Sequence, residues 1–221
     1  MPLSRDRETT RFPDQGGIRF DGGSGGDGGT IVGLRAANGI VVVADARVST
    51  DTGVESESIQ KIQTVHPTAV LGSPGHPGPV QEVIRSVDRA ADRYELDRGR
   101  PMDIPVLKEV VMDEVRARNV DGQFVLAGVD DQGPHIYTIS PDQGALAHEY
   151  VAIGTGMQAA YGQLVSGDVE SLTLEEARNL AVRAIRSAAE RDVHTGPGGH
   201  VAEVTDAGVS LDAIESFDTA V

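Results

Sequence analysis

Two charged residues in this sequence lie where charges are costly. Asp45 ends the apolar run Ile40-Val41-Val42-Val43-Ala44, and Lys61 lies in the apolar stretch Ile59-Gln60-Lys61-Ile62. A buried carboxylate or ammonium is expensive unless it is paired, so we expect Asp45 and Lys61 to form an ion pair. Two interpretations stay open. The pair is structural, or Asp45 holds a lysine whose field lowers the pKa of a nearby amine or hydroxyl and so prepares a nucleophile.

Two other residues carry weaker signals for chemistry. Thr155, in Gly154-Thr155-Gly156, presents one hydroxyl from a tight loop, although an ordinary turn does the same. Asp192 follows a long predicted helix, at the end where an acid opposes the helix dipole. It therefore has a partner or is simply solvated.

Metal binding has little support in the sequence. His194 and His200 flank a glycine-rich loop, but no third ligand has suitable spacing and loop histidines are usually solvated. Cysteine is absent, which excludes a disulfide scaffold, a thiol nucleophile and cysteine–zinc sites. We predict no metal and no other cofactor.

The charge balance limits the partners. The 221 residues carry a net charge of −15, from 34 acidic and 19 basic residues, which argues against nucleic acids and anionic membranes as partners. There is no apolar run near 18 residues and no secretory signal, so we expect a cytoplasmic protein. Only Lys61 and Lys108 among the basic residues are lysines. This composition is typical of a protein kept soluble in concentrated salt; an ordinary acidic cytosolic protein is the alternative.

Hydrophobic periodicity predicts the elements that position these residues. Strands are expected at 30–36, 40–45, 59–65, 69–71, 123–129, 135–139, twice within 145–153, at 201–204 and at 208–211. Helices are expected at 79–98, 104–118, after Gly156, and at 174–191 with Thr173 as N-cap. This order predicts an α+β fold in which sheets lie between helical layers.

The first 29 residues form a separate segment. They are polar and rich in glycine from Gly16 to Gly29, so they cannot bury enough apolar area to offset their chain entropy. We predict a disordered tail at 1–29 and one domain at 30–221.

The motifs together resemble a proteasome β-type subunit. Those similar to its start are Thr-Ile-Val-Gly at 30–33, Asn-Gly-Ile-Val-Val-Val-Ala-Asp-Ala-Arg at 38–47 and Gln-Lys-Ile at 60–62. The similarity continues through Arg-Tyr-Glu-Leu-Asp-Arg-Gly-Arg-Pro-Met at 93–102, Ala-Gly-Val-Asp at 127–130, Gly-Pro-His-Ile-Tyr at 133–137, Gly-Thr-Gly at 154–156 and Glu-Arg-Asp at 190–192. The resemblance implies the four-layer αββα sandwich of the N-terminal-nucleophile hydrolases. It also implies a 20S core particle as the setting, with α-type and other β-type subunits as partners and unfolded polypeptides as substrates. The glycine-rich tail is similar to a β-type propeptide.

The resemblance also implies roles for individual residues. In active family members an N-terminal threonine attacks the peptide carbonyl, and its own α-amine is the base. Asp45 and Lys61 match the aspartate and lysine that polarise this end of the site, and Asp192 matches the later aspartate. Thr155 and Thr195 stand where the family has serines. The oxyanion and substrate-binding positions correspond to Arg47, Ser49, Ser73 and Gly75.

The nucleophile is where the sequence departs from the family. Asp45 and Lys61 lie 16 and 32 residues after Gly29, which places Gly29 where the family has its first threonine. Glycine has no hydroxyl, so it forms no acyl-enzyme and cannot carry out the self-cleavage that exposes the amine. Several noncatalytic eukaryotic β-type subunits likewise lack this threonine. In addition, the segment 72–78 contains Pro74 and Pro77, and we expect these prolines to disturb a strand that pairs with substrate.

Three functions follow as hypotheses. The first is a noncatalytic β-type ring component, and the second is an active threonine endopeptidase that uses Thr30 after cleavage behind Gly29. The second hypothesis places the nucleophilic hydroxyl one residue later than in the family, which shifts it by about 3.3–3.6 Å along the chain. Attack on a carbonyl is sensitive to much smaller displacements. The third is a free-standing acidic binding protein with the same fold.

Overall fold

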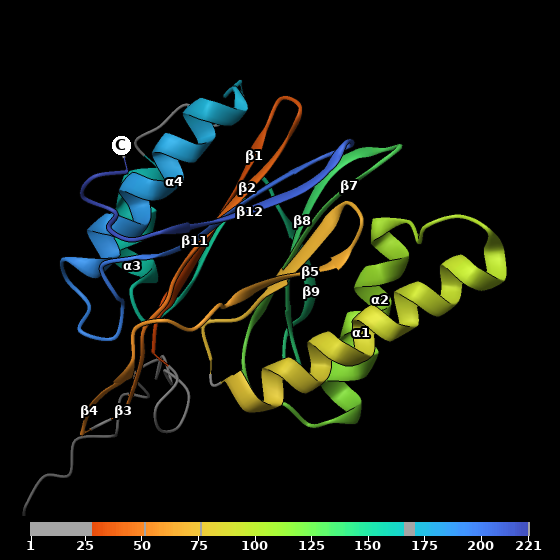
Figure 1. Ribbon diagram of the computed structural model, residues 1–221, viewed down its shortest axis with the longest axis horizontal. Helices are drawn as coiled ribbons and strands as arrows, with labels where there is room; N and C mark the ends of the chain where they lie inside the picture. The colour runs from red at the N-terminus through yellow and green to blue at the C-terminus, as the bar shows by residue number, and fades with distance from the viewer. Residues whose placement is uncertain (1–27, 51, 76, 166–170, 221) are drawn as a thin grey trace, which may run out of the picture.

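The computed structural model describes residues 28–50, 52–75, 77–165 and 171–220. The predicted disordered tail therefore lies outside the described residues, except for Gly28 and Gly29. The described part folds into two five-stranded sheets that pack face to face between two pairs of helices (Figure 1).

The first sheet carries the start of the ordered chain. Its strand order is β10 (Tyr150–Gly154), β1 (Thr30–Ala36), β2 (Gly39–Asp45), β11 (Gly199–Thr205) and β12 (Gly208–Ile214), and all neighbours are antiparallel. The predicted Asn-Gly hairpin joins β1 to β2, with Ala36 opposite Gly39. All seven residues of β2 are buried, as its apolar sequence predicts for a central strand covered on both faces.

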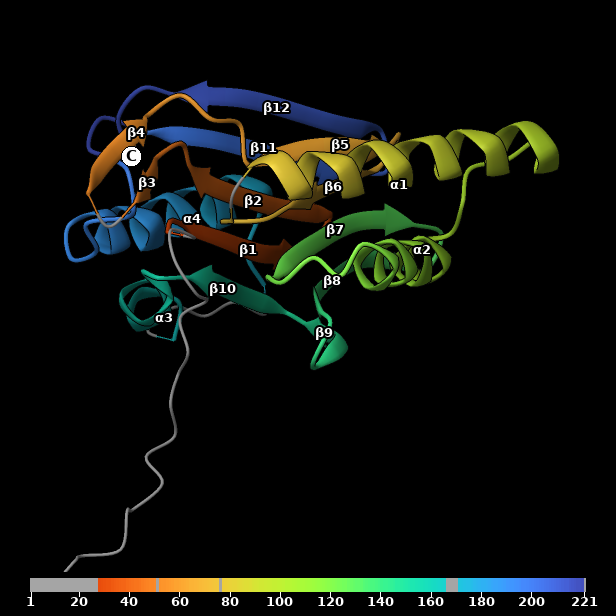
Figure 2. The ribbon, with the colours of Figure 1, turned by 90° about the horizontal axis from the view of Figure 1, so that it is seen from below.

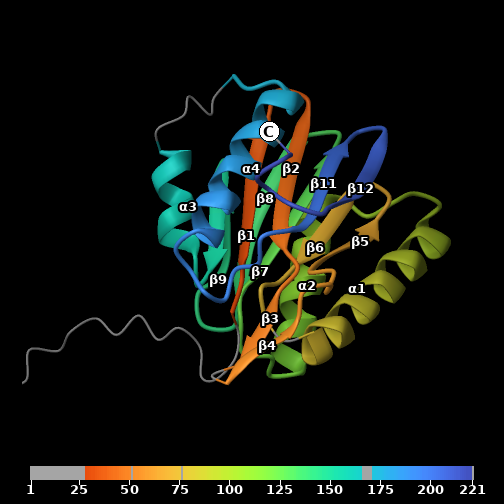
Figure 3. The same ribbon diagram turned by 60° about the vertical axis from the view of Figure 1, so that its left-hand side comes forward.

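The second sheet has the strand order β5 (Ile62–His66), β6 (Ala69–Gly72), β7 (Phe124–Asp130), β8 (Gly133–Ser140) and β9 (Gly144–His148), and is also antiparallel. The chain passes between β9 and β10 through Glu149, so these two strands connect the sheets at one edge. A short hairpin, β3 (Val48–Thr50) with β4 (Gly53–Ser56), lies beyond the end of β2 (Figure 3).

The helices form the two outer layers (Figures 2 and 3). Helices α3 (Met157–Leu164) and α4 (Leu174–Ala189) cover the first sheet, and α1 (Pro77–Arg98) and α2 (Ile104–Ala117) cover the second. Thr173 caps α4 as predicted, in a reciprocal capping box with Glu176. One apolar core lies under each helical layer and a third lies between the sheets. This arrangement confirms the predicted αββα sandwich.

Two expectations about local structure are wrong, and one hairpin was not expected. The β3–β4 hairpin is absent from the prediction, and β5 begins at Ile62 rather than Ile59. Residues 73–75 do not form a strand, because β6 ends at Gly72, and α1 begins at Pro77. Pro77 therefore occupies the first position of a helix, where a missing N–H costs nothing, and Pro74 lies in the connecting bend. The prolines do not interrupt a strand here.

Candidate functional site

The predicted ion pair forms at the end of β2. Lys61 Nζ lies 2.9 Å from Asp45 Oδ1, and the two side chains are 1% and 0% exposed. The other carboxylate oxygen accepts the backbone N–H groups of Arg47 and Gly196, at 2.8 and 3.0 Å. Asp45 is thus fully paired although it is buried. Burial lowers the pKa of Lys61 below its ordinary value, and the attraction of Asp45 offsets part of that effect.

The ammonium of Lys61 points at the backbone of residues 28 and 29. It donates to the carbonyl oxygen of Gly28 at 3.3 Å. A Cβ atom built on Gly29 would lie 2.0 Å from Nζ and 2.7 Å from Asp45 Oδ1. The ammonium therefore occupies the volume in which a side chain at position 29 would begin. Gly29 also has a φ of +126°, a backbone conformation that only glycine adopts without strain.

A second group of residues holds Gly29 from the other side. Thr155 N–H donates to the Gly29 carbonyl at 2.9 Å, and Gly29 N–H donates to Thr155 Oγ1 at 3.1 Å. Asp192 Oδ2 accepts the hydroxyl of Thr155 and, at 2.6 Å, that of Thr195. The sequence left open whether Asp192 has a partner or is simply solvated. The structure gives it two hydroxyl partners, Thr155 and Thr195.

Thr30 faces away from Lys61. Successive residues of a strand point to opposite faces, and Thr30 shares its face with Val32 and Leu34, which pack against the α3–α4 layer. Its hydroxyl is fully buried, lies 2.8 Å from Thr195 Oγ1 and accepts Gly156 N–H at 3.1 Å. Its backbone N–H donates to Asp45 Oδ1 at 2.8 Å. Asp45 thus approaches the main chain of Thr30, while the Thr30 hydroxyl belongs to the Thr195–Asp192 network.

The residues predicted to bind substrate are bonded within the chain. The Arg47 guanidinium binds Glu57 Oε1 at 2.7 Å and the Val193 carbonyl at 2.8 Å. Gly75 N–H, the predicted oxyanion donor, donates to Ser73 Oγ at 3.3 Å. Ser49 Oγ is hydrogen-bonded to His194 Nδ1 at 2.7 Å.

His194 and Gly28 are the residues of the site that sequence reasoning missed. A Cβ atom on Gly28 would lie 2.2 Å from His194 Cβ, so the imidazole side chain lies directly on the Gly28 backbone. In the sequence, His194 and His200 flank a glycine-rich loop, a pattern that indicates at most a metal ligand and gives no sign of the contact between His194 and Gly28. Within the described ranges no three His, Cys, Asp or Glu residues are placed to hold a metal ion.

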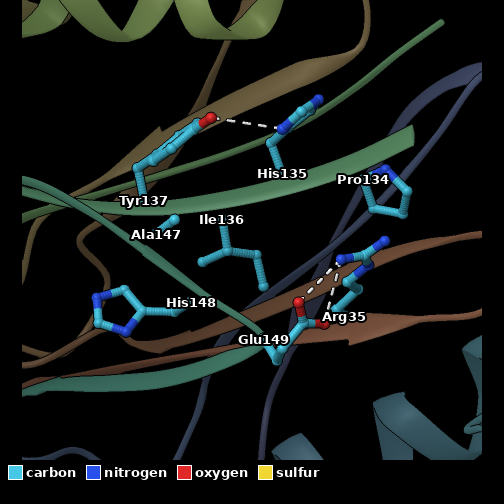
Figure 4. A pocket seen from close by; sticks show the side chains of 8 residues that line it. All are labelled: Arg35, Pro134, His135, Ile136, Tyr137, Ala147, His148 and Glu149. Carbon is cyan, nitrogen blue, oxygen red and sulfur yellow. Dashed lines mark hydrogen bonds and ion pairs between the residues drawn. The ribbon is translucent and has the colours of Figure 1, made fainter. Parts of the chain in front are cut away.

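A separate pocket is lined by residues of β1, β8 and β9 together with Glu149 (Figure 4). The ion pair between Arg35 and Glu149, at 2.9 Å, lies on the same side of β8 as Ile136, whereas the side chains of His135 and Tyr137 point to the other side of that strand. Arg35 is five residues along β1 from Thr30, which is about 17 Å at the usual rise of a strand. The pocket therefore contributes nothing to the chemistry around Asp45 and Lys61.

Comparison with known proteins agrees with the fold. The family described as "Proteasome subunit" matches residues 26–204. A proteasome subunit beta from Halorhabdus utahensis is 39% identical over 98% of this chain and 94% of its own length. Proteasome subunit beta 2 of Haloterrigena turkmenica is 38% identical over 88% of this chain and 83% of its own, and proteasome subunit beta of Haloferax volcanii is 37% identical over 86% and 79%.

The chain belongs to the proteasome subunit family, and the predicted resemblance to β-type subunits is confirmed. These relatives come from halophilic archaea, which supports the interpretation of the acidic, lysine-poor composition as an adaptation to salt. Among the helices of the described residues, none is both long and apolar enough to cross a membrane.

Proposed function

We propose that this chain is a noncatalytic β-type component of the 20S proteasome core. One observation carries the proposal: the Asp45–Lys61 pair converges on Gly29, a residue that has no hydroxyl. The surrounding network of Thr155, Asp192 and Thr195 has the composition of a threonine-peptidase site, whereas its centre has no nucleophile. In this proposal the residues that would polarise a nucleophile instead hold the uncleaved Gly28–Gly29 peptide.

The proposal includes the partners and the setting. The chain assembles with α-type subunits and other β-type subunits, and unfolded polypeptides meet it only through that complex. The helical layer of α1 and α2 is the surface that we assign to contacts with neighbouring subunits. The net charge of −15 makes nucleic acids and anionic membranes poor partners, and we assign the complex to the cytoplasm.

The geometry favours this function over an endopeptidase that uses Thr30. After cleavage behind Gly29, the hydroxyl of Thr30 would need to leave its bonds with Thr195 and Gly156 and reach the opposite face of β1. Attack requires reacting atoms about 3–3.5 Å apart and aligned. The third hypothesis, a free-standing binding protein, differs from the proposed function only in that the chain has no α-type partners.

Two measurements on the natively expressed protein test the proposal. We expect an intact mass that includes residues 1–29 and no hydrolysis of fluorogenic peptides, with Thr30→Ala indistinguishable from wild type. A wild type trimmed to Thr30, with peptidase activity that Thr30→Ala removes, would establish the shifted nucleophile instead. Co-expression with α-type subunits is expected to give a co-purifying complex; a folded monomer that ignores them would support the free-standing protein.

A further inference from the structure

Gly28 is held on both sides where the chain enters the site. On one side Lys61 Nζ donates to its carbonyl oxygen at 3.3 Å. On the other side lies His194: a Cβ atom added to Gly28 would be 2.2 Å from His194 Cβ and 2.6 Å from Cγ. Because any side chain at position 28 would overlap His194, only glycine fits at this position between Lys61 and His194.

His194 is itself fixed at two points. Its backbone N–H donates to Asp192 Oδ1 at 3.2 Å, and its ring Nδ1 is hydrogen-bonded to Ser49 Oγ at 2.7 Å. Ser49 is 3% exposed and lies on β3, while His194 lies in the loop between α4 and β11. The hydrogen bond therefore joins two separate segments, and the imidazole lies against the backbone of Gly28. It involves neither Asp45 nor Lys61.

We propose that the Ser49–His194 pair is a latch that retains residues 28 and 29 in the site. The inference rests on the proposed function, since it requires that the chain before Gly29 is kept. His194 acts as a positioning residue: its Cβ and Cγ contact Gly28, and the bond to Ser49 prevents the ring from swinging away. Residues 28 and 29 are then retained for two reasons. The contacts with His194 hold them in place, and position 29 has no hydroxyl that could cleave the chain before it.

Hydrogen–deuterium exchange of the full-length protein tests the latch, after an intact mass shows which residues are present. In His194→Ala and Ser49→Ala we expect the amides of Gly28 and Gly29 to exchange about tenfold faster, the loss that one hydrogen bond and its contacts would produce. His194→Asn keeps Cβ, Cγ and an acceptor for Ser49, so its exchange should stay near the wild-type rate. Val193→Ala is the matched control, because the neighbouring Val193 is 76% exposed.

The outcomes separate the latch from the proposed function. Equal exchange in all variants, with the tail present, overturns the latch alone. Faster exchange in Val193→Ala as well means that any change in this loop loosens the segment, and it also overturns the latch. A wild-type protein that lacks residues 1–28 overturns both the latch and the proposed function. Melting temperatures of the variants separate local release from global unfolding.

Discussion

Replacing Gly29 with threonine tests whether a hydroxyl is all that the site lacks. The new Cβ would lie 2.0 Å from Lys61 Nζ and 2.7 Å from Asp45 Oδ1, so the flexible end of Lys61 must move. The φ of +126° adds a strain of about 1–3 kcal/mol for a residue other than glycine. In a domain of this size we expect the melting temperature to fall by roughly 2–12 °C.

Cleavage of the peptide bond between residues 28 and 29 would remove this strain, because an N-terminal residue has no φ to constrain. Relief of about 3 kcal/mol corresponds to roughly a hundredfold shift in an equilibrium. We therefore expect Gly29→Thr, assembled with α-type subunits, to lose residues 1–28 and to hydrolyse fluorogenic peptides at least weakly. Intact mass and initial hydrolysis rates are the two readouts. Adding Lys61→Ala should abolish both effects.

Gly29→Ala is the matched control for this experiment. It introduces the same Cβ and the same backbone strain without a hydroxyl, so it should be destabilised to a similar extent and keep its tail. The reasoning fails if Gly29→Thr folds, assembles and matches Gly29→Ala in retaining the tail without any hydrolysis. In that case the site lacks more than the hydroxyl.

Four further results are expected. The melting temperature should rise steeply from dilute buffer to molar salt, since 34 acidic residues repel one another where screening is weak; a flat profile would contradict the halophile interpretation. Burial lowers the pKa of His66, and likewise of His148 and His200, below the ordinary 6.5, so the unfolded chain binds these protons more readily and stability should decrease as pH falls through about 6.5; His66→Gln should weaken that dependence in pH-dependent thermal unfolding, and an unchanged profile would contradict a contribution from His66. Lys61→Met leaves Asp45 buried without its cation and should cost about 3–5 kcal/mol in denaturant unfolding, whereas a loss under 1 kcal/mol would mean that water reaches the site. Thr173→Ala removes the cap of α4 and should cost about 1 kcal/mol by the same measurement, which an unchanged midpoint would refute.

Local patterns in the sequence predicted most of the fold. The buried strand β2, the hairpin before it and the cap at Thr173 each depend on neighbouring residues only, so their signals can be read from short windows. The β3–β4 hairpin gave no such signal, because Gly53, Val54 and Glu55 are exposed and show no apolar alternation. The cost of burying charge predicted the Asp45–Lys61 pair without any structural information.

The rest of the site depends on contacts between distant segments. Thr155 bonds Gly29 across 126 positions, and Thr195 bonds Thr30 across 165. Hydrophobic periodicity carries no information about contacts between segments so far apart in the sequence. Only the family resemblance placed these threonines near the site. The face on which Thr30 presents its hydroxyl follows from strand alternation, but the partner on that face follows only from tertiary packing. For the same reason His194 was assessed only as a possible metal ligand.

The placement of Lys61 also sets what any side chain at position 29 would require. Its ammonium occupies the volume that a side chain would need, and the backbone there has a conformation that only glycine adopts without strain. A substitution to threonine therefore meets both an occupied space and a strained backbone before any benefit of the hydroxyl appears. A hydroxyl at this position becomes useful only once the lysine and the main chain have moved as well.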